Sequence, residues 1–220
     1  MITSQLGASL SLFVTFEGSE GCGKSTQAKI LWQKLLDSGI PAELTYEPGG
    51  TPLGNRLRRI LKEGAGGNLT SLSELLLFIV CRAELVDKVI MPGLVQGKAI
   101  ICDRFADSTV AYQGYGRGLD MGIIDYMNRL ATGGLKPDLT VLLDLPVVEG
   151  LGRKSGSVYD RFEAEDIDFH ERVRKGYLEL AIREPGRWLV IDANRPKGEI
   201  SGVIWEKVVD LLRQKGEVIR

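Results

Sequence analysis

The chain has 220 residues, of which 44% are hydrophobic and 26% are charged, as in a soluble globular protein large enough to bury a substantial core. Its 28 basic and 29 acidic residues give a formal net charge of −1, which argues against a nucleic-acid-binding surface and favours a small phosphorylated ligand. The single histidine, His170, excludes histidine-dependent triads and multi-histidine metal sites.

The first apolar run and the cysteines predict the compartment. We expect residues 1–9 to form a loose tail, and the apolar run Leu10–Phe16 is too short to span a bilayer. The cysteines Cys22, Cys81 and Cys102 show no paired spacing, which is typical of a reducing cytoplasm. The sequence therefore predicts a single cytoplasmic domain over residues 1–220, without a membrane or nucleic-acid partner.

A glycine-rich loop follows the first predicted strand, which ends at Phe16. Gly18, Gly23, Lys24 and Ser25 occupy the fixed positions of the pattern Gly-x-x-x-x-Gly-Lys-Ser, and a helical pattern begins directly afterwards. A strand, this loop and a helix define a P-loop, whose backbone amides hold phosphate oxygens. We expect Lys24 to reach the β- and γ-phosphates of a nucleotide and Ser25 to hold Mg²⁺. The residues expected to bind ATP are Gly18, Ser19, Glu20, Gly21, Cys22, Gly23, Lys24, Ser25 and Thr26.

Two elements with a stiff turn between them come next. After the first helix, over residues 25–38, a short strand is predicted at 42–46, and Glu47-Pro48-Gly49-Gly50-Thr51 can continue neither a helix nor a central strand. A helix over 53–62 carries a basic face, which we interpret as solvated.

A long helix is predicted to begin at Ser71 and to end near Val89. Ser71 and Glu74 have the spacing of a capping box, and Pro92-Gly93 closes or kinks the helix. Because it is apolar on several faces, we expect it to be buried, either inside one chain or against a second subunit.

The remaining elements complete an alternating pattern. Strands are predicted at 99–102, 139–145 and 188–192, and helices at 120–131, 147–152, 167–182 and 198–215. Five strands alternating with helices indicate a parallel α/β sheet with right-handed crossovers. Ligands of such sheets bind beyond the carboxyl ends of the strands, which places the P-loop, Glu47, Asp103-Arg104 and Asp144 on one rim.

Charged residues on this rim suggest phosphate chemistry. Asp103 can hold Mg²⁺ directly or through water, and Arg104 can clamp a phosphate. Glu20, within the P-loop, would repel phosphates, so it needs a partner such as Mg²⁺, a substrate hydroxyl or an arginine. A basic loop at 153–161 can close over a transferring phosphoryl group or can be a solvated surface loop.

Together these motifs resemble the thymidylate kinase family over residues 12–192, in the order in which the family carries them. The resemblance rests on the P-loop with Phe16-Glu17 before it and on Glu47-Pro48-Gly49-Gly50-Thr51, Phe78-x-x-x-Arg82, Asp103-Arg104-Phe105, Ser108-Thr109-x-Ala111-Tyr112-Gln113-Gly114, Pro137-Asp138-Leu139-Thr140 and Asp160-Arg161-Phe162-Glu163. It implies a P-loop kinase fold, in which a five-stranded parallel sheet has helices on both faces, and a lid near residues 150–163. It also implies transfer of phosphate from ATP to thymidine monophosphate with Mg²⁺, for dTTP synthesis, by a homodimer.

The resemblance further implies roles for single residues. Lys24, Arg104, Glu20 and a basic lid residue would be catalytic, and Ser25 and Asp103 would hold the metal. Because the P-loop has no arginine, the chain resembles the bacterial type, whose lid supplies the basic residue; Arg153 is our first choice, before Lys154 and Arg161. Phe78 would stack on thymine, Arg82 would approach its O4 edge, Thr109 and Gln113 would read N3, and Tyr112 would lie by the deoxyribose. The residues expected to bind the acceptor are Glu47, Phe78, Arg82, Arg104, Thr109, Tyr112 and Gln113.

Two other readings compete with this one. A kinase for a different nucleoside monophosphate would share the P-loop but not the base-contacting residues. A P-loop GTPase usually carries Asn-Lys-x-Asp, and the nearest match here, Asn194-Arg195-Pro196-Lys197, lacks the acid.

Overall fold

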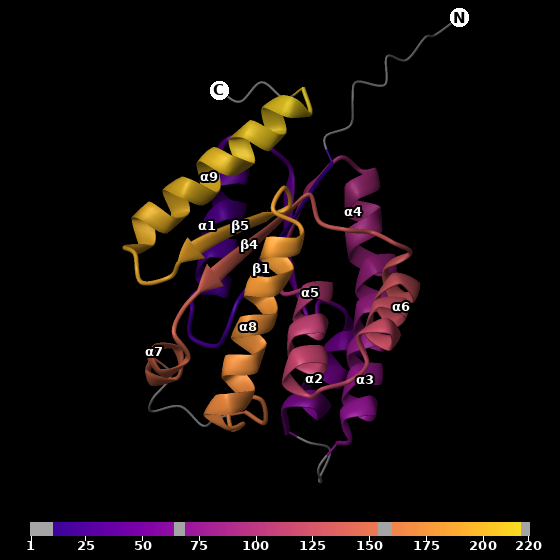
Figure 1. Ribbon diagram of the computed structural model, residues 1–220. Helices are drawn as coiled ribbons and strands as arrows, with labels where there is room; N and C mark the ends of the chain where they lie inside the picture. Colours follow the sequence, from indigo (N-terminus) through magenta and orange to yellow (C-terminus); the bar gives the residue numbers. More distant parts are fainter. Residues whose placement is uncertain (1–10, 64–68, 154–159, 217–220) are drawn as a thin grey trace, which may run out of the picture.

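The computed structural model describes residues 11–63, 69–153 and 160–216 (Figure 1). The strands are β1 (Leu12–Glu17), β2 (Ala42–Tyr46), β3 (Ala99–Asp103), β4 (Leu139–Asp144) and β5 (Trp188–Asp192). The helices are α1 (Lys24–Asp37), α2 (Pro52–Glu63), α3 (Ser71–Leu85), α4 (Met91–Val95), α5 (Ala106–Thr109), α6 (Met121–Thr132), α7 (Val147–Gly152), α8 (Ile167–Arg183) and α9 (Lys197–Gln214). Two π-helical turns, η1 (Val86–Ile90) and η2 (Val110–Gly116), extend α3 and α5.

The strands form one parallel sheet in the order β2-β3-β1-β4-β5, which confirms the predicted fold class. The central strand β1 is fully buried, and successive side chains point to opposite faces of the sheet. Leu12, Val14 and Phe16 therefore pack in one hydrophobic cluster, whereas Phe13 belongs to another. Because the strands are parallel, β1 and β3 end side by side, with Phe16 opposite Asp103.

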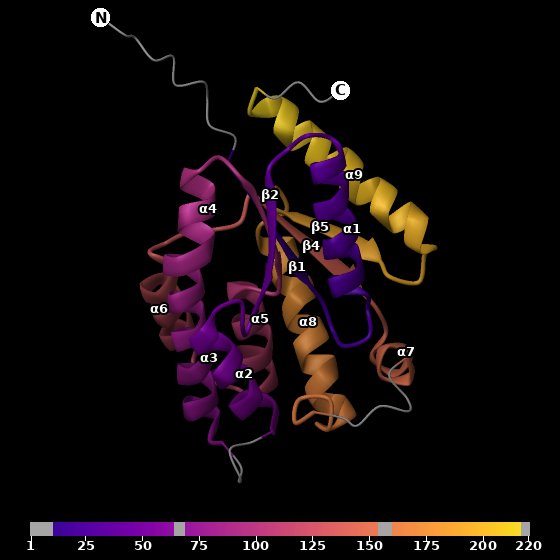
Figure 2. The same cartoon turned by 180° about the vertical axis from the view of Figure 1, so that it is seen from behind.

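Helices cover both faces of the sheet. On one face α1 and α9 pack together, and their apolar residues join the cluster that contains Val14. On the other face α8 lies against β4 and β5, and Figures 1 and 2 show α3, α4 and α6 grouped beside it. Among the described helices, none has both the length and the apolar character needed to cross a membrane.

The long predicted helix differs from expectation at its start. The N-cap is Thr70, whose side chain accepts a hydrogen bond from the backbone N–H of Ser73, and Ser71 is already the first helical residue. The predicted capping box of Ser71 and Glu74 is therefore wrong. Glu74 is turned into the protein and is fully buried, so it does not cap the helix.

The same helix also differs in length and burial. The α-helix ends at Leu85, and η1 and α4 continue its direction as far as Val95. Burial of all its faces inside one chain is ruled out, because Leu72, Leu76 and Val80 are 54%, 42% and 45% exposed; burial against a second subunit stays a prediction. Between α5 and α6 the chain contains the π-helical turn η2, a rare conformation that is frequent at functional sites.

Candidate active site

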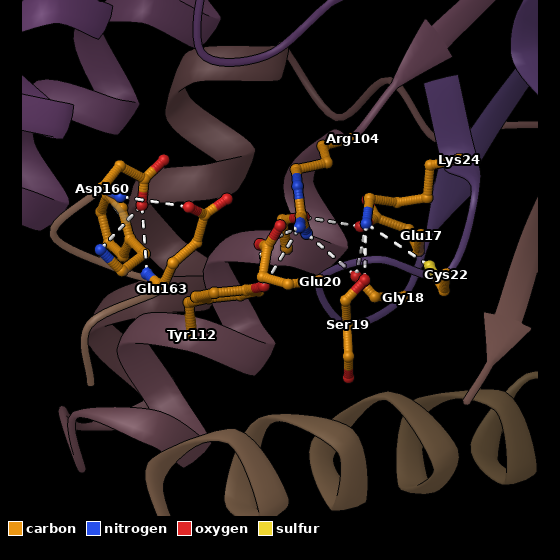
Figure 3. A network of polar contacts seen from close by, with 12 residues as sticks. Glu17, Gly18, Ser19, Glu20, Cys22, Lys24, Arg104, Tyr112, Asp160 and Glu163 are labelled. Carbon is orange, nitrogen blue, oxygen red and sulfur yellow. Dashed lines mark hydrogen bonds and ion pairs between the residues drawn. The ribbon is translucent and has the colours of Figure 1, made fainter. Parts of the chain in front are cut away.

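The P-loop connects β1 to α1 as the sequence predicted. Gly18, Gly21 and Gly23 have φ values of 138°, 69° and 94°, which residues other than glycine rarely adopt. The loop therefore curls over the end of β1, and the Lys24 ammonium donates to the carbonyl oxygens of Gly18 (3.1 Å) and Ser19 (2.7 Å) (Figure 3). This is the concave, amide-rich shape that binds phosphate groups.

Ser25 and Asp103 meet next to the P-loop. The Ser25 hydroxyl donates to the Asp103 carboxylate, because the first turn of α1 and the end of β3 lie at the same rim. Within the described residues, no group of three or more acids, histidines or cysteines surrounds a common point. A hydroxyl and one carboxylate fit a hard cation that takes its other ligands from water and substrate phosphates, as Mg²⁺ does in nucleotide sites.

Arg104 points from the end of β3 toward the P-loop, where it contacts Glu20 and Tyr112. Its Nη2 atom donates to Glu20 Oε1 (2.5 Å) and to the Tyr112 hydroxyl (3.1 Å), and that hydroxyl donates to Glu20 (2.8 Å). Its Nη1 atom donates to the Gly18 carbonyl oxygen at 3.2 Å. The compensating partner that Glu20 needs in a phosphate-binding loop is thus an arginine.

The backbone of Arg104 is in the left-handed region, with φ at 72°, the single positive φ of a non-glycine residue in the described chain. Such a conformation costs about 1–3 kcal/mol and persists where the surroundings enforce it, often at functional sites. Here Arg104 N–H donates to the Phe16 carbonyl oxygen at 3.0 Å, which fixes the turn beside the P-loop.

Glu17, the last residue of β1, lies behind Arg104. Its carboxylate accepts hydrogen bonds from the Phe105 N–H (2.8 Å) and from the hydroxyls of Ser108 (2.6 Å) and Tyr177 (2.9 Å). Complete burial, together with the negative charge of Asp107, raises the pKa of Glu17 to about 7. Since the Ser108 and Tyr177 hydroxyls also accept from Arg104, Glu17 supports the arginine indirectly.

A cavity of about 730 Å³ lies between the P-loop, the ends of β2 and β3, and helices α2 and α3, with η2 and the residues Asp160, Phe162 and Glu163 on its far side. Its size suits small-molecule binding. It brings together twelve of the sequence-predicted site residues: Glu20, Gly21, Gly23, Lys24, Ser25, Thr26, Glu47, Phe78, Asp103, Arg104, Tyr112 and Gln113. Phe78 and Gln113 thus line the same cavity, an aromatic residue and an amide residue on its far side from the P-loop. The other predicted P-loop contacts, Gly18, Ser19 and Cys22, do not line this cavity, and the Cys22 side chain is buried.

Arg82 and Thr109 lie behind the cavity wall. Arg82 is fully buried and forms an ion pair with Glu47, with 2.6 Å between Nη2 and Oε2. It also donates to Asn128 Oδ1 (2.6 Å), the Phe105 carbonyl oxygen (3.2 Å) and Thr109 Oγ1 (2.9 Å). Neither Arg82 nor Thr109 lines the cavity, so the structure uses them to hold α3, β2 and α5 together, and their expected contacts with a base stay predictions.

The lid residues occupy separate places. Arg153 is exposed, and it donates to the Ala193 carbonyl oxygen (3.3 Å) and to Asn194 Oδ1 (2.7 Å), at the connection after β5. Arg161 is held against α2 and α3 by the Leu61 carbonyl oxygen (3.1 Å) and by Glu74 (2.6 Å). Neither lines the cavity, and Lys154 lies outside the described residues.

Sequence reasoning missed two basic residues of the cavity. Arg58 and Lys62 line it from α2, and the interpretation of this helix face as merely solvated is wrong for them. Lys62 pairs with Asp160 (2.9 Å), and Arg58 lies over the Tyr46 ring, 5.2 Å from its centroid. Their spacing of four residues, just after the Glu-Pro-Gly-Gly-Thr turn, was the available signal, because it puts both side chains on one face of the helix.

The parallel sheet, the P-loop at its carboxyl edge and the acid–arginine pair beside it define a P-loop phosphotransferase. A family model described as thymidylate kinase matches residues 16–204. The chain belongs to the thymidylate kinase family.

Individual relatives agree with the family model. A thymidylate kinase of Dehalococcoides mccartyi is 49% identical over 208 residues, covering 94% of this chain and 100% of the relative. One from Geotalea daltonii is 47% identical over 211 residues, covering 92% and 99%. The crystal structure of thymidylate kinase from Ehrlichia chaffeensis superimposes with a TM-score of 0.74 at 39% identity, covering 91% of this chain and 99% of that one.

Proposed function

We propose that the chain transfers the γ-phosphoryl group of ATP to thymidine monophosphate, in the synthesis of dTTP, with Mg²⁺ as the divalent cation. The observation that carries this proposal is that the P-loop, the Asp103-Arg104 strand end, and Phe78 with Gln113 line one and the same cavity. Family membership supports the reaction and both substrates.

Each residue near the P-loop has a proposed task. Lys24 and the P-loop amides hold the ATP phosphates, and Ser25 and Asp103 hold the cation, which would neutralise charge on the phosphates. Arg104 holds the acceptor phosphate, because its guanidinium lies between the P-loop and the Tyr112 side of the cavity. Glu20 keeps Arg104 oriented until the acceptor arrives.

The acceptor base is expected on the far side of the cavity from the P-loop. Phe78 offers a ring for stacking, and Gln113 offers an amide to the base edge. Tyr112, whose hydroxyl is shared by Arg104 and Glu20, lies where a sugar next to the acceptor phosphate would pass. Glu47 contributes chiefly by fixing Arg82.

Arg153 is the proposed cation of the lid. Arg161 is already paired with a buried partner, Glu74, whereas Arg153 is exposed and, within the described residues, donates to the β5–α9 connection. We expect Arg153→Ala to lower kcat by about 10³-fold or more while leaving the Kd for ATP nearly unchanged, since charge is needed mainly in the transition state. Steady-state kinetics with ATP titration would measure both, and small, equal changes would rule out this role.

The acceptor is tested by ADP release across a panel of nucleoside monophosphates and nucleosides. We expect strong turnover with thymidine monophosphate, loss of turnover with EDTA and recovery with Mg²⁺. Preference for another monophosphate would keep the kinase but overturn the assignment of the base site. Slow GTP hydrolysis without any acceptor would instead indicate a GTPase.

We also propose a cytoplasmic homodimer. The exposed residues Leu72, Leu76 and Val80 form a stripe on α3, and Ile123, Tyr126 and Leu130 form another on the neighbouring α6. We call these six residues the α3–α6 face. Contiguous exposed apolar surface of this kind marks protein interfaces, and a second copy would cover it. Three buried, free cysteines agree with a reducing compartment.

A further inference from the structure

Glu74 is a buried acid that the proposed reaction does not use. It lies in the first turn of α3, its side chain is fully buried, and it faces η2 rather than the helix end. Its Oε1 atom accepts a hydrogen bond from the Gln113 Nε2 atom at 2.7 Å. A residue of the cavity wall is thus held from behind by a carboxylate.

Two arginines compensate the charge of this carboxylate. Arg117 donates from Nε to Oε1 (3.3 Å) and from Nη2 to Oε2 (3.2 Å) of Glu74, and Arg161 Nη2 lies 2.6 Å from Oε2. Arg117 is itself anchored by Glu165, 2.6 Å away. Both carboxylate oxygens are therefore engaged by donors, and the group acts only as an acceptor.

An acceptor behind Gln113 decides which way its amide faces. Only the NH₂ group can bond an ionised carboxylate, so the amide carbonyl oxygen must point away from Glu74. In the described part of the chain no donor bonds that oxygen, and Gln113 lines the cavity together with Phe78. The Gln113 carbonyl oxygen is thereby a fixed hydrogen-bond acceptor for a ligand in the cavity.

We propose that Glu74 is a positioning residue that sets base specificity by locking the Gln113 amide with its carbonyl oxygen toward the base. This inference rests on the proposed function, in which Gln113 reads the acceptor base. Thymine and uracil present an N3–H donor to such an oxygen. Cytosine presents a bare N3 acceptor there, so two lone pairs would face each other and dCMP is rejected.

The variant Glu74→Gln tests the lock with little change of shape. The two arginines claim the single carbonyl oxygen of the new side chain, which turns its NH₂ group toward Gln113. The Gln113 amide then rotates to bond that NH₂ group and shows its own NH₂ to the cavity. We expect the ratio of kcat/KM for dTMP over dCMP to fall by at least about tenfold, because discrimination depends on an unpaired polar group.

Two further variants separate the lock from general loosening. Arg117→Gln removes bonds to Glu74 but leaves the Glu74–Gln113 contact, so it should lower thermal stability and keep the ratio. In a chain that already carries Gln113→Ala, adding Glu74→Gln should not change the ratio of kcat/KM for dTMP over dCMP further, since the amide that contacts the base is gone. If Glu74→Gln lowers only stability, or if Arg117→Gln lowers the ratio equally, the proposal is wrong.

A measurement on the wild-type chain covers the case in which Glu74→Gln does not fold. The Gln113 side-chain amide is identified by ¹⁵N NMR as the signal missing in Gln113→Ala, and its protons should exchange slowly with solvent, both without and with dTMP. Fast exchange in either state overturns the proposal. A wild-type chain that does not phosphorylate dTMP defeats the proposed function instead, whereas normal wild-type turnover with an unchanged Glu74→Gln ratio defeats only this inference.

Discussion

Glu17 shows how a single buried residue can make folding depend on pH. The pKa of its carboxyl is about 7 in the folded chain against an ordinary value of 4.5, mainly because of burial. Between these two values the unfolded chain releases the proton and the folded chain keeps it. The free energy of unfolding should therefore fall as pH rises from about 4.5 and level off above about 7.

The variant Glu17→Gln should remove this contribution. A shift of this size corresponds to about 3 kcal/mol, so the stability of wild type relative to the variant should decrease by about that amount between pH 4.5 and 8. The amide oxygen can still accept from the Phe105 N–H, and the two hydroxyls can reverse their roles. Urea unfolding at a series of pH values measures the difference, and parallel curves for the two proteins would contradict the raised pKa.

Arg82 is the second residue whose role depends on burial. It pairs with Glu47 where both side chains are almost inaccessible, so Arg82→Ala leaves a buried carboxylate without its partner. We expect a loss of about 3–5 kcal/mol in the free energy of unfolding. Arg129→Ala is the matched control, because the Arg129–Asp125 pair is 66% and 61% exposed and should contribute less than about 1 kcal/mol. A higher KM for dTMP with unchanged stability would indicate instead that Arg82 contacts the base.

At the scale of elements, α7 and the P-loop meet through two glycines. A Cβ atom on Gly150 would lie 2.3 Å from the Glu20 carbonyl oxygen, and one on Gly21 would lie 2.1 Å from the Gly150 carbonyl oxygen. Backbone packs directly against backbone here, so a methyl group on either glycine must displace α7 or the P-loop. Gly21 is therefore required for its close contact with Gly150 as well as for its positive φ. The Gly-x-x-x-x-Gly-Lys-Ser pattern does not reveal this contact.

Gly150→Ala should therefore impair catalysis. Misplacing reacting groups by about 1 Å can cost about 10²-fold, and we expect a loss of that order in kcat/KM for ATP. Gly152→Ala, in the same short helix, meets nothing within 4 Å and should behave like wild type. Steady-state kinetics compares the two, and equal activities would show that the contact is unimportant.

At the scale of the whole molecule, the α3–α6 face predicts the assembly. Leu76→Glu places a charge in the middle of the stripe on α3, where the proposed second copy would have to desolvate it. We expect sedimentation velocity to show a dimer for wild type and a monomer for the variant. Ile182→Glu, at a 77% exposed position on α8, is the control and should remain dimeric. A wild-type monomer at micromolar concentration would refute the proposed assembly.

The sequence predicted those features that local pattern encodes. Apolar runs gave the five strands, the glycine spacing gave the P-loop, and the alternation of strands and helices gave a parallel sheet with its ligand rim. Asp103 and Arg104 were placed correctly beside the loop because parallel strands end at the same edge. The family was also recognisable from ordered motifs, and the comparisons confirm it.

Contacts between side chains on different helices could not be predicted from the sequence. Arg82 and Gln113 both belong to motifs of the family, yet one is buried behind the cavity and the other faces it. Glu74 has the spacing of a capping residue, but it pairs with Gln113, Arg117 and Arg161 instead. In the sequence, Arg58 and Lys62 have the pattern of solvated charges. They line the cavity because of where α2 lies in the fold.

By itself the sequence determined the backbone class, the phosphate loop and the family, because propensity, periodicity and glycine geometry act over a few neighbouring residues. Only the tertiary structure decided which charges are buried, which line the cavity and how the Gln113 amide is turned. Those choices depend on how helices cross the sheet, since the crossing sets the distance between residues that lie far apart in the chain, such as Glu74 and Arg161.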